Sequence, residues 1–138
     1  MVIDASVALA WCFPDEDSDY ADGVLAALEG RAIVVPALWP IEVTNAVLVA
    51  ERRKRIRPLE IRRFVELLDN LSVSVDSRSV TECVNNVLPL AREYGLSAYD
   101  AAYLDVAMQR GAPLATLDGR LQRAGREVGI EIFRSGRE

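Results

Sequence analysis

The chain has 138 residues, of which 51% are hydrophobic and 27% are charged, and its formal net charge is −5. This length and composition predict one compact domain and exclude a disordered chain, and no apolar run approaches the ~20 residues that a membrane span requires. The sequence contains no histidine and a single lysine, which excludes Ser-His-Asp triads, Cys-His dyads and His-ligated zinc. The phosphate-binding patterns GxxxxGKS/T and GxGxxG are also absent, so carboxylates, hydroxyls and arginines are left for chemistry.

Short apolar runs alternate with segments of helical periodicity, which is typical of a parallel sheet wrapped by helices. The expected strands are 1–4, 32–35, 71–75, 113–116 and 130–133. The expected helices are 7–11, 18–29, 38–53, 58–70, 79–94, 97–110 and 119–127. We assign residues 1–133 to a single domain and residues 134–138 to a short, frayed C-terminal tail.

The two cysteines, Cys12 and Cys83, form neither a CxxC pair nor a disulfide framework. We therefore expect two buried thiols in a reducing cytosol. Met1 is followed directly by an apolar strand, without a basic segment, so no secretory signal is expected.

Two of the predicted strands end in a carboxylate next to a hydroxyl. Asp4 and Ser6 follow the first strand, and Thr116 and Asp118 follow the fourth. Because ligands of open α/β sheets bind beyond the carboxyl ends of the strands, these side chains are candidates for one site. Structural roles also stay open, namely an N-cap for Asp4 and an Asp-Gly turn for Asp118.

Glu42 is the only ionisable residue between positions 38 and 50, in the middle of a predicted helix. A carboxylate on such an apolar helix is costly unless another group pairs with it. Asn45 lies about 60° further round and shares its face, whereas Glu51 lies on the opposite side and faces solvent. The alternative is that Glu42 sits at an exposed edge of the helix.

Asp100 stands at the start of the predicted helix 97–110. Ser97-x-x-Asp100 resembles a capping box, which is the structural alternative to a functional role. The rest of this turn is small and apolar, which favours a packed position. Asp105 lies about 140° further round the helix, so it cannot share a site with Asp100, and we expect it at the surface.

Four carboxylates from four places would then meet, namely Asp4, Glu42, Asp100 and Asp118. Each close pair at ~5 Å repels by about 3 kcal/mol at an effective dielectric constant of about 20. With no lysine or histidine nearby in the sequence, a divalent cation is the natural partner, and oxygen ligands favour Mg²⁺ or Mn²⁺ over Zn²⁺. Such a site serves phosphodiester hydrolysis by metal-activated water.

Four short motifs, in their order and spacing, resemble those of PIN domains. They are Val2-Ile3-Asp4-Ala5-Ser6, Glu42-Val43-Thr44-Asn45, Tyr99-Asp100-Ala101-Ala102-Tyr103 and Thr116-Leu117-Asp118. The length and the short, helix-rich middle look like the VapC toxin branch, the ribonuclease half of a toxin–antitoxin pair. The resemblance covers nearly the whole chain, from Val2 to about Phe133.

The resemblance implies a three-layer α/β/α fold with a five-stranded parallel sheet. It implies endonucleolytic, in-line cleavage of RNA in the cytoplasm, a cognate antitoxin that blocks the site, and a homodimer. The carboxylates that would hold one or two Mg²⁺ ions are Asp4, Glu42, Asp100 and Asp118. The side chains that would orient these carboxylates or a water molecule are Ser6, Asn45 and Thr116.

A concentrated basic run follows the helix of Glu42. It comprises Arg52, Arg53, Lys54, Arg55 and Arg57, with Arg62 and Arg63 further on. The run begins roughly 15 Å along the helix from Glu42, a distance that an RNA strand could span. It either contacts RNA phosphates or complements the negative end of the helix dipole, and both interpretations stay open.

Aromatic side chains are further candidates for RNA contact, because bases stack on them. They are Trp11, Trp39, Tyr99 and Tyr103. For both tryptophans, packing in the core or at a dimer interface is the preferred interpretation.

Other functions fit these residues less well. A phosphatase of the haloacid dehalogenase type needs a second Asp where this chain has Ser6, together with a downstream lysine, and a phospho-receiver domain fails on the same missing lysine. A degenerate PIN domain that binds RNA or a partner without cleaving it is disfavoured by the presence of all four acids. An RNA-processing PIN nuclease outside a toxin–antitoxin pair usually carries extra domains, for which 138 residues leave no room.

Overall fold

The computed structural model describes residues 1–16 and 18–136 of the chain. The strands in these residues are β1 (Val2–Ile3), β2 (Ala32–Pro36), β3 (Ser72–Asp76) and β4 (Leu114–Ala115). The helices are α1 (Ala5–Cys12), α2 (Asp19–Ala27), α3 (Trp39–Arg52), α4 (Pro58–Asp69), α5 (Val80–Tyr94), α6 (Ala98–Arg110) and α7 (Gly119–Glu127). None of these helices is long and apolar enough to cross a membrane.

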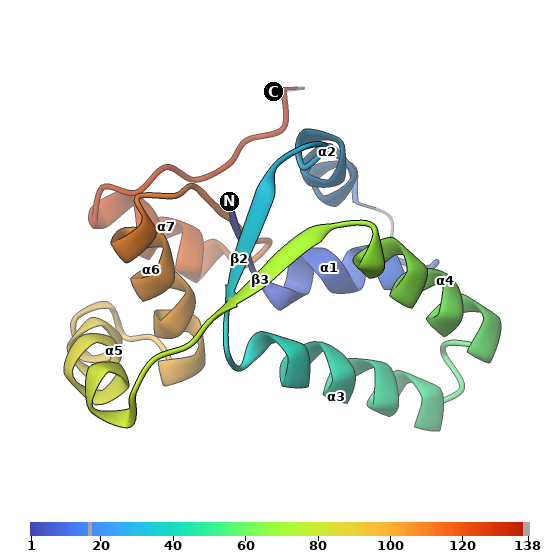
Figure 1. The fold of residues 1–138 in the computed structure, drawn as a ribbon, viewed down its shortest axis with the longest axis horizontal. Helices are drawn as coiled ribbons and strands as arrows, with labels where there is room; N and C mark the ends of the chain where they lie inside the picture. Colours follow the sequence, from blue (N-terminus) through green and yellow to red (C-terminus); the bar gives the residue numbers. More distant parts are fainter. Residues whose placement is uncertain (17, 137–138) are drawn as a thin grey trace.

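The described strands form one parallel sheet in the order β3-β2-β1-β4. Helix α1 packs with α2, α3 and α4 on one side of the sheet, while α6, flanked by α5 and α7, covers the other (Figure 1). Both residues of the central strand β1 are fully buried, which accounts for its short, wholly apolar sequence. The polar residues that follow β1 and β4 therefore emerge at one edge of a sheet covered on both faces.

The expected fifth strand is not confirmed in the described residues. Segment 130–133 contributes a single parallel bridge, Leu114 to Ile132, beside β4. Beyond it the chain is held toward α2, because the Tyr20 hydroxyl donates a hydrogen bond to the Phe133 carbonyl at 2.9 Å. Ser135 then lies so close to Gly23 that a Cβ there would come within 2.7 Å of it. The predicted frayed tail is thus packed at Ser135, and its last two residues lie outside the described part.

The prediction of two buried thiols is half right. Cys12 is buried on α1, and burial, followed by the charges of Glu60 and Glu16, raises its pKa to about 11. Cys83 is exposed on α5, so that part of the prediction is wrong. The physical reason is that α5 packs against α6 on the outside of the layer and buries none of its own residues completely.

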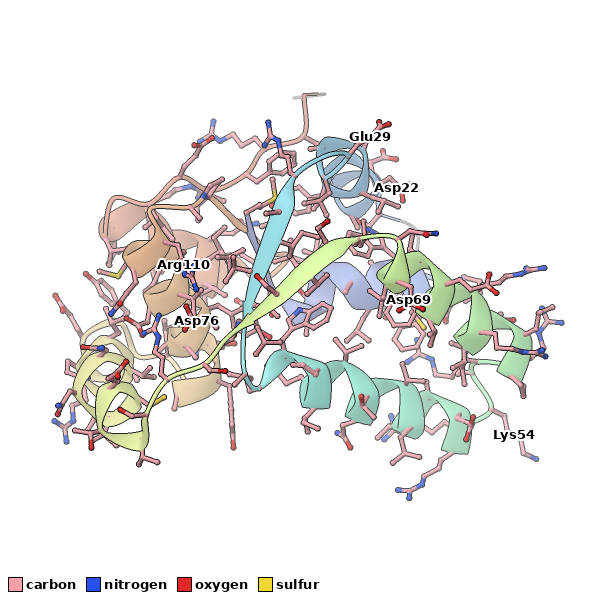
Figure 2. All side chains as sticks on the ribbon, in the orientation of Figure 1. Asp22, Glu29, Lys54, Asp69, Asp76 and Arg110 are labelled. Atoms are coloured by element: carbon pink, nitrogen blue, oxygen red, sulfur yellow. The ribbon has the colours of Figure 1, made fainter. Side chains whose placement is uncertain are left out.

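The prediction that Asp105 lies at the surface is also wrong, because its side chain is buried in an ion-pair cluster. Asp105 pairs with the guanidinium of Arg78, which also donates to Asp76 at 2.9 Å. Arg110 completes the cluster by contacting Asp76 at 3.0 Å, and Figure 2 shows these two side chains beside each other. Burial alone would raise the pKa of Asp76, but hydrogen bonds from Arg78 and Arg110 bring that pKa below its ordinary value. The cluster ties the edge strand β3 to α6.

Candidate active site

Asp4 lies directly beyond β1 and is only 7% exposed. Its backbone N–H donates to the carbonyl of Ala115 at 2.9 Å, which fixes it against β4. Although it occupies the N-cap position of α1, its side chain makes no capping hydrogen bond. Instead its Oδ2 atom accepts hydrogen bonds from Ser6 at 2.9 Å and from Thr116 at 2.7 Å. A carboxylate held by hydroxyls alone keeps its negative charge uncompensated.

The same two hydroxyls join the ends of β1 and β4. Thr116 Oγ1 accepts from the backbone N–H of Asp118 at 3.0 Å, and Ser6 Oγ accepts from the backbone N–H of Leu117 at 3.3 Å. Thr116 is completely buried, so its side chain anchors this network in the core. The structure therefore places two of the predicted site residues, Ser6 and Thr116, in contact with Asp4.

Asp118 is the N-cap of α7. Its Oδ1 atom accepts from the backbone N–H groups of Arg120 at 2.8 Å and Leu121 at 3.3 Å. The structural alternative of an Asp-Gly turn is therefore wrong for this residue, because Gly119 already begins the helix that Asp118 caps. The cap engages one carboxylate oxygen and leaves the other for a ligand.

Glu42 lies in the first turn of α3, and not in the middle of a helix as predicted. Its Oε1 atom accepts a hydrogen bond from the Tyr103 hydroxyl at 2.8 Å. Burial raises the pKa of Glu42, the Tyr103 hydrogen bond opposes this, and the negative charges of Asp4 and Asp100 raise the pKa further. Asn45, one turn later, is exposed.

Asp100 lies in the first turn of α6, where its backbone N–H donates to the N-cap side chain of Ser97 at 3.1 Å. Burial raises the pKa of Asp100, and the negative charges of Asp118 and Asp4 raise it further. The four predicted acids are thus electrostatically coupled at one place in the fold. None of the ion pairs in the described part of the chain involves them.

The four acids lie near one another, but their carboxylates do not point at one common ion position. Among residues 1–16 and 18–136, no three carboxylates or thiols are placed closely enough to hold one ion as they stand. A hollow of about 660 Å³ lies elsewhere, at the opposite edge of the sheet, and contains none of the four acids. The donor set nevertheless suits a hard divalent cation, because it offers carboxylate oxygens. Burial and the nearby negative charges raise the pKa values of two of these acids, Glu42 and Asp100.

The raised pKa of Asp100 predicts a pH-dependent cost to the metal-free fold. For an acid whose pKa is higher in the folded than in the unfolded chain, the stabilising contribution is complete below the ordinary pKa, here 3.8, and is lost as the pH rises through the folded value. In EDTA at about pH 8, Asp100→Asn should therefore melt at a higher temperature than the wild type, with the difference fading toward about pH 4. Thermal unfolding followed by circular dichroism checks this, and a variant less stable than the wild type at the higher pH would contradict it.

The basic run is partly neutralised. Arg55 contacts Asp15 at 3.4 Å and lies 5.0 Å from the ring centroid of Phe13, and Arg57 pairs with Glu60 at 2.6 Å. The remaining members, Arg52, Arg53 and Lys54, are exposed. They gather where α3 ends, and Figure 2 shows Lys54 at the end of α3 remote from the sheet.

Sequence reasoning missed the contact between Tyr103 and Glu42. Tyr103 is completely buried, so it cannot stack on a base, whereas Tyr99 is 66% exposed. Trp39 is buried, as predicted for a core residue. The sequence signal that could have found the contact between Tyr103 and Glu42 is the spacing of Tyr103 from Asp100. A tyrosine three residues after Asp100 lies about one helical turn further along and on the same side of the helix.

These features place a group of acidic side chains near the carboxyl ends of strands in a parallel sheet, and comparison with known proteins identifies the family. The chain belongs to the PIN domain family, whose model matches residues 1–127. This confirms the family predicted from the four motifs.

Individual relatives extend over most of the chain. It is 30% identical over 121 residues to Ribonuclease VapC3 of Pyrobaculum aerophilum, covering 88% of this chain and 91% of that protein. The crystal structure of PAE2754 from the same organism superposes with a TM-score of 0.66 at 27% identity, covering 89% of this chain and 77% of that one. VapBC2 from Rickettsia felis, in a crystal structure with a DNA fragment from its promoter, has a TM-score of 0.62 at 13% identity and 96% coverage of both chains. The last likeness shows the fold alone.

Proposed function

We propose that this protein is a Mg²⁺-dependent endoribonuclease and the toxin of a toxin–antitoxin pair. The observation that carries the proposal is the grouping of Asp4, Glu42, Asp100 and Asp118. Burial, followed by the charges of neighbouring acids in this group, raises the pKa values of Glu42 and Asp100. The similarity to Ribonuclease VapC3 over most of the chain supports RNA as the substrate. Mn²⁺ is expected to substitute for Mg²⁺, since both prefer oxygen ligands.

Each acid has a distinct role in this proposal. Asp4 is the fixed ligand, because two hydroxyls hold its Oδ2 atom. Asp118 offers the carboxylate oxygen that its cap leaves unused. Glu42 and Asp100, in the first turns of α3 and α6, would turn toward the ion. When bound, the ion supplies Lewis acidity that activates water and neutralises charge on the phosphate.

The partners are proposed from the family. We expect a cognate antitoxin to cover the acidic site and two copies of the chain to form a homodimer. We expect the protein to act on RNA in the cytosol. The unpaired cysteines Cys12 and Cys83 agree with a reducing compartment. Residues 1–133 are proposed as the single catalytic domain.

The proposal is tested by incubating the purified protein with total RNA in Mg²⁺ or in EDTA. Discrete fragments that form only with the metal are expected, and mapping their ends identifies the RNA and the sequence that is cut. Inducing the gene alone and together with its neighbouring gene tests the toxin role, with growth arrest expected only in the first case. Cleavage without any growth effect would favour an RNA-processing nuclease.

A second candidate function is a PIN domain that binds RNA without cleaving it. The observation that favours it is the absence of three convergent acids among the described residues. Retention of uncleaved RNA by the protein in Mg²⁺ and in Mn²⁺ would establish this alternative.

The exposed part of the basic run is proposed to contact RNA phosphates. Replacing Arg52, Arg53 and Lys54 together by alanine should weaken RNA binding and reduce its salt dependence, by about 0.7 in the log–log slope for each phosphate that the variant no longer neutralises. Binding of an oligoribonucleotide measured at several salt concentrations checks this. Arg92→Ala on α5 is the control, and an unchanged slope in the triple variant would assign the run to the helix dipole alone.

A further inference from the structure

We propose that Tyr103 is a positioning residue, whose hydroxyl holds one oxygen of Glu42 and thereby presents the other to the cation. The inference rests on the proposed function, since it concerns how the metal-binding acids are oriented. Tyr103 is the last residue of the motif that contains Asp100, but that motif alone does not show that the Tyr103 hydroxyl meets Glu42.

The contact is direct and joins two helices. The Tyr103 hydroxyl on α6 donates to Glu42 Oε1 on α3 at 2.8 Å. No hydrogen bond within the described residues reaches the second oxygen, Oε2. A carboxylate whose one oxygen is held in this way loses rotational freedom, so its other oxygen has a defined direction.

The direction of the hydrogen bond is fixed by protonation. The phenol hydroxyl has one proton to donate, whereas an ionised carboxylate has none and can only accept. Tyr103 consequently acts as a donor to Glu42 whenever Glu42 is charged.

Tyr103 also belongs to the helix that carries Asp100, which it follows by about one turn of α6. Helix α6 packs against β1, the strand that ends directly before Asp4. The hydrogen bond from Tyr103 therefore ties Glu42 to the helix of a second acid, Asp100.

A purely structural role would not need the hydroxyl. The Tyr103 ring is completely buried, and a phenylalanine would fill the same space without placing a polar atom in the core. A buried hydroxyl is costly unless it is hydrogen-bonded, and here its acceptor is one of the four acids.

The test compares Mn²⁺ binding to the metal-free wild type and to Tyr103→Phe by isothermal titration calorimetry. Loss of a group that orients a metal ligand typically costs about 10–100-fold in metal affinity, so the dissociation constant should rise by that factor. Tyr94→Phe, which removes a hydroxyl at the end of α5, should bind as the wild type does. A Tyr103→Phe protein that melts earlier but binds Mn²⁺ with unchanged affinity would overturn the inference.

A second measurement needs no variant of Tyr103. In protein labelled with ¹³C at the tyrosine Cζ atoms, Mg²⁺ should shift the Tyr103 resonance and leave that of Tyr94 unchanged. A Tyr103 chemical shift that does not change at saturating Mg²⁺ would refute the positioning role. A wild type that binds neither Mn²⁺ nor Mg²⁺ would instead refute the proposed metal-dependent function, so the two failures are distinguishable.

Discussion

Asp4→Asn should abolish RNA cleavage while leaving the fold intact. Asp4 is the most fixed of the four acids, and its substitution removes a negative charge without changing the side chain's shape. The amide oxygen can still accept from Ser6 and Thr116, so the join between β1 and β4 should survive. Because loss of a group that merely orients a ligand costs about 10–100-fold, loss of the ligand itself should cost more than about 100-fold.

The measurement is the initial rate of cleavage of a defined RNA, with thermal unfolding as a check on the fold. Asp69→Asn is the matched control, since Asp69 is exposed at the end of α4 (Figure 2). It lies just before the start of β3, whereas Asp4 and Asp118 follow the carboxyl ends of β1 and β4. The control should cleave as the wild type does. An Asp4→Asn protein that retains full activity would remove Asp4 from the site.

Arg78→Met should produce the largest loss of stability. Arg78 and Asp105 are only 9% and 7% exposed in their side chains, and they pair with each other. Removing one partner leaves a buried carboxylate uncompensated, which costs about 3–5 kcal/mol. Chemical denaturation at neutral pH measures the change in the free energy of unfolding.

Two further variants isolate the cause of that loss. Arg110→Met should cost at most about 1 kcal/mol, because the Arg110 side chain is 51% exposed and solvent screens its contact with Asp76. The double variant Arg78→Met/Asp105→Leu should recover most of the missing stability, since buried ion pairs can be replaced by apolar residues at little cost. A loss below about 1 kcal/mol in Arg78→Met would mean that the cluster contributes little to the fold.

The strand-end part of the site was predictable from the sequence. Val2-Ile3 and Leu114-Ala115 are short apolar runs followed at once by polar residues, and parallel strands bring such ends to one edge of a sheet. The structure accordingly joins Asp4 to Ser6 and Thr116. These residues could be placed together because parallel strands all end at the same edge of the sheet.

The helical part was less predictable, because periodicity shows which residues share a face but not what that face meets. The angle between Asp100 and Asp105 correctly separated them, yet it could not show that Arg78 pairs with Asp105 in the interior. The same limit hid the contact of Tyr103 with Glu42 across two helices. The fifth strand failed for a related reason, since Tyr20 on a distant helix binds the Phe133 carbonyl.

The central claim is that Asp4, Glu42, Asp100 and Asp118 together bind the divalent cation that RNA cleavage requires. Crystals grown with Mn²⁺ and measured for anomalous scattering test this most directly. We predict a peak of anomalous density in contact with Asp4 and at least two of the other three carboxylates. Crystals of protein that cleaves RNA with Mn²⁺, yet shows no peak among these four side chains at saturating Mn²⁺, would contradict the account.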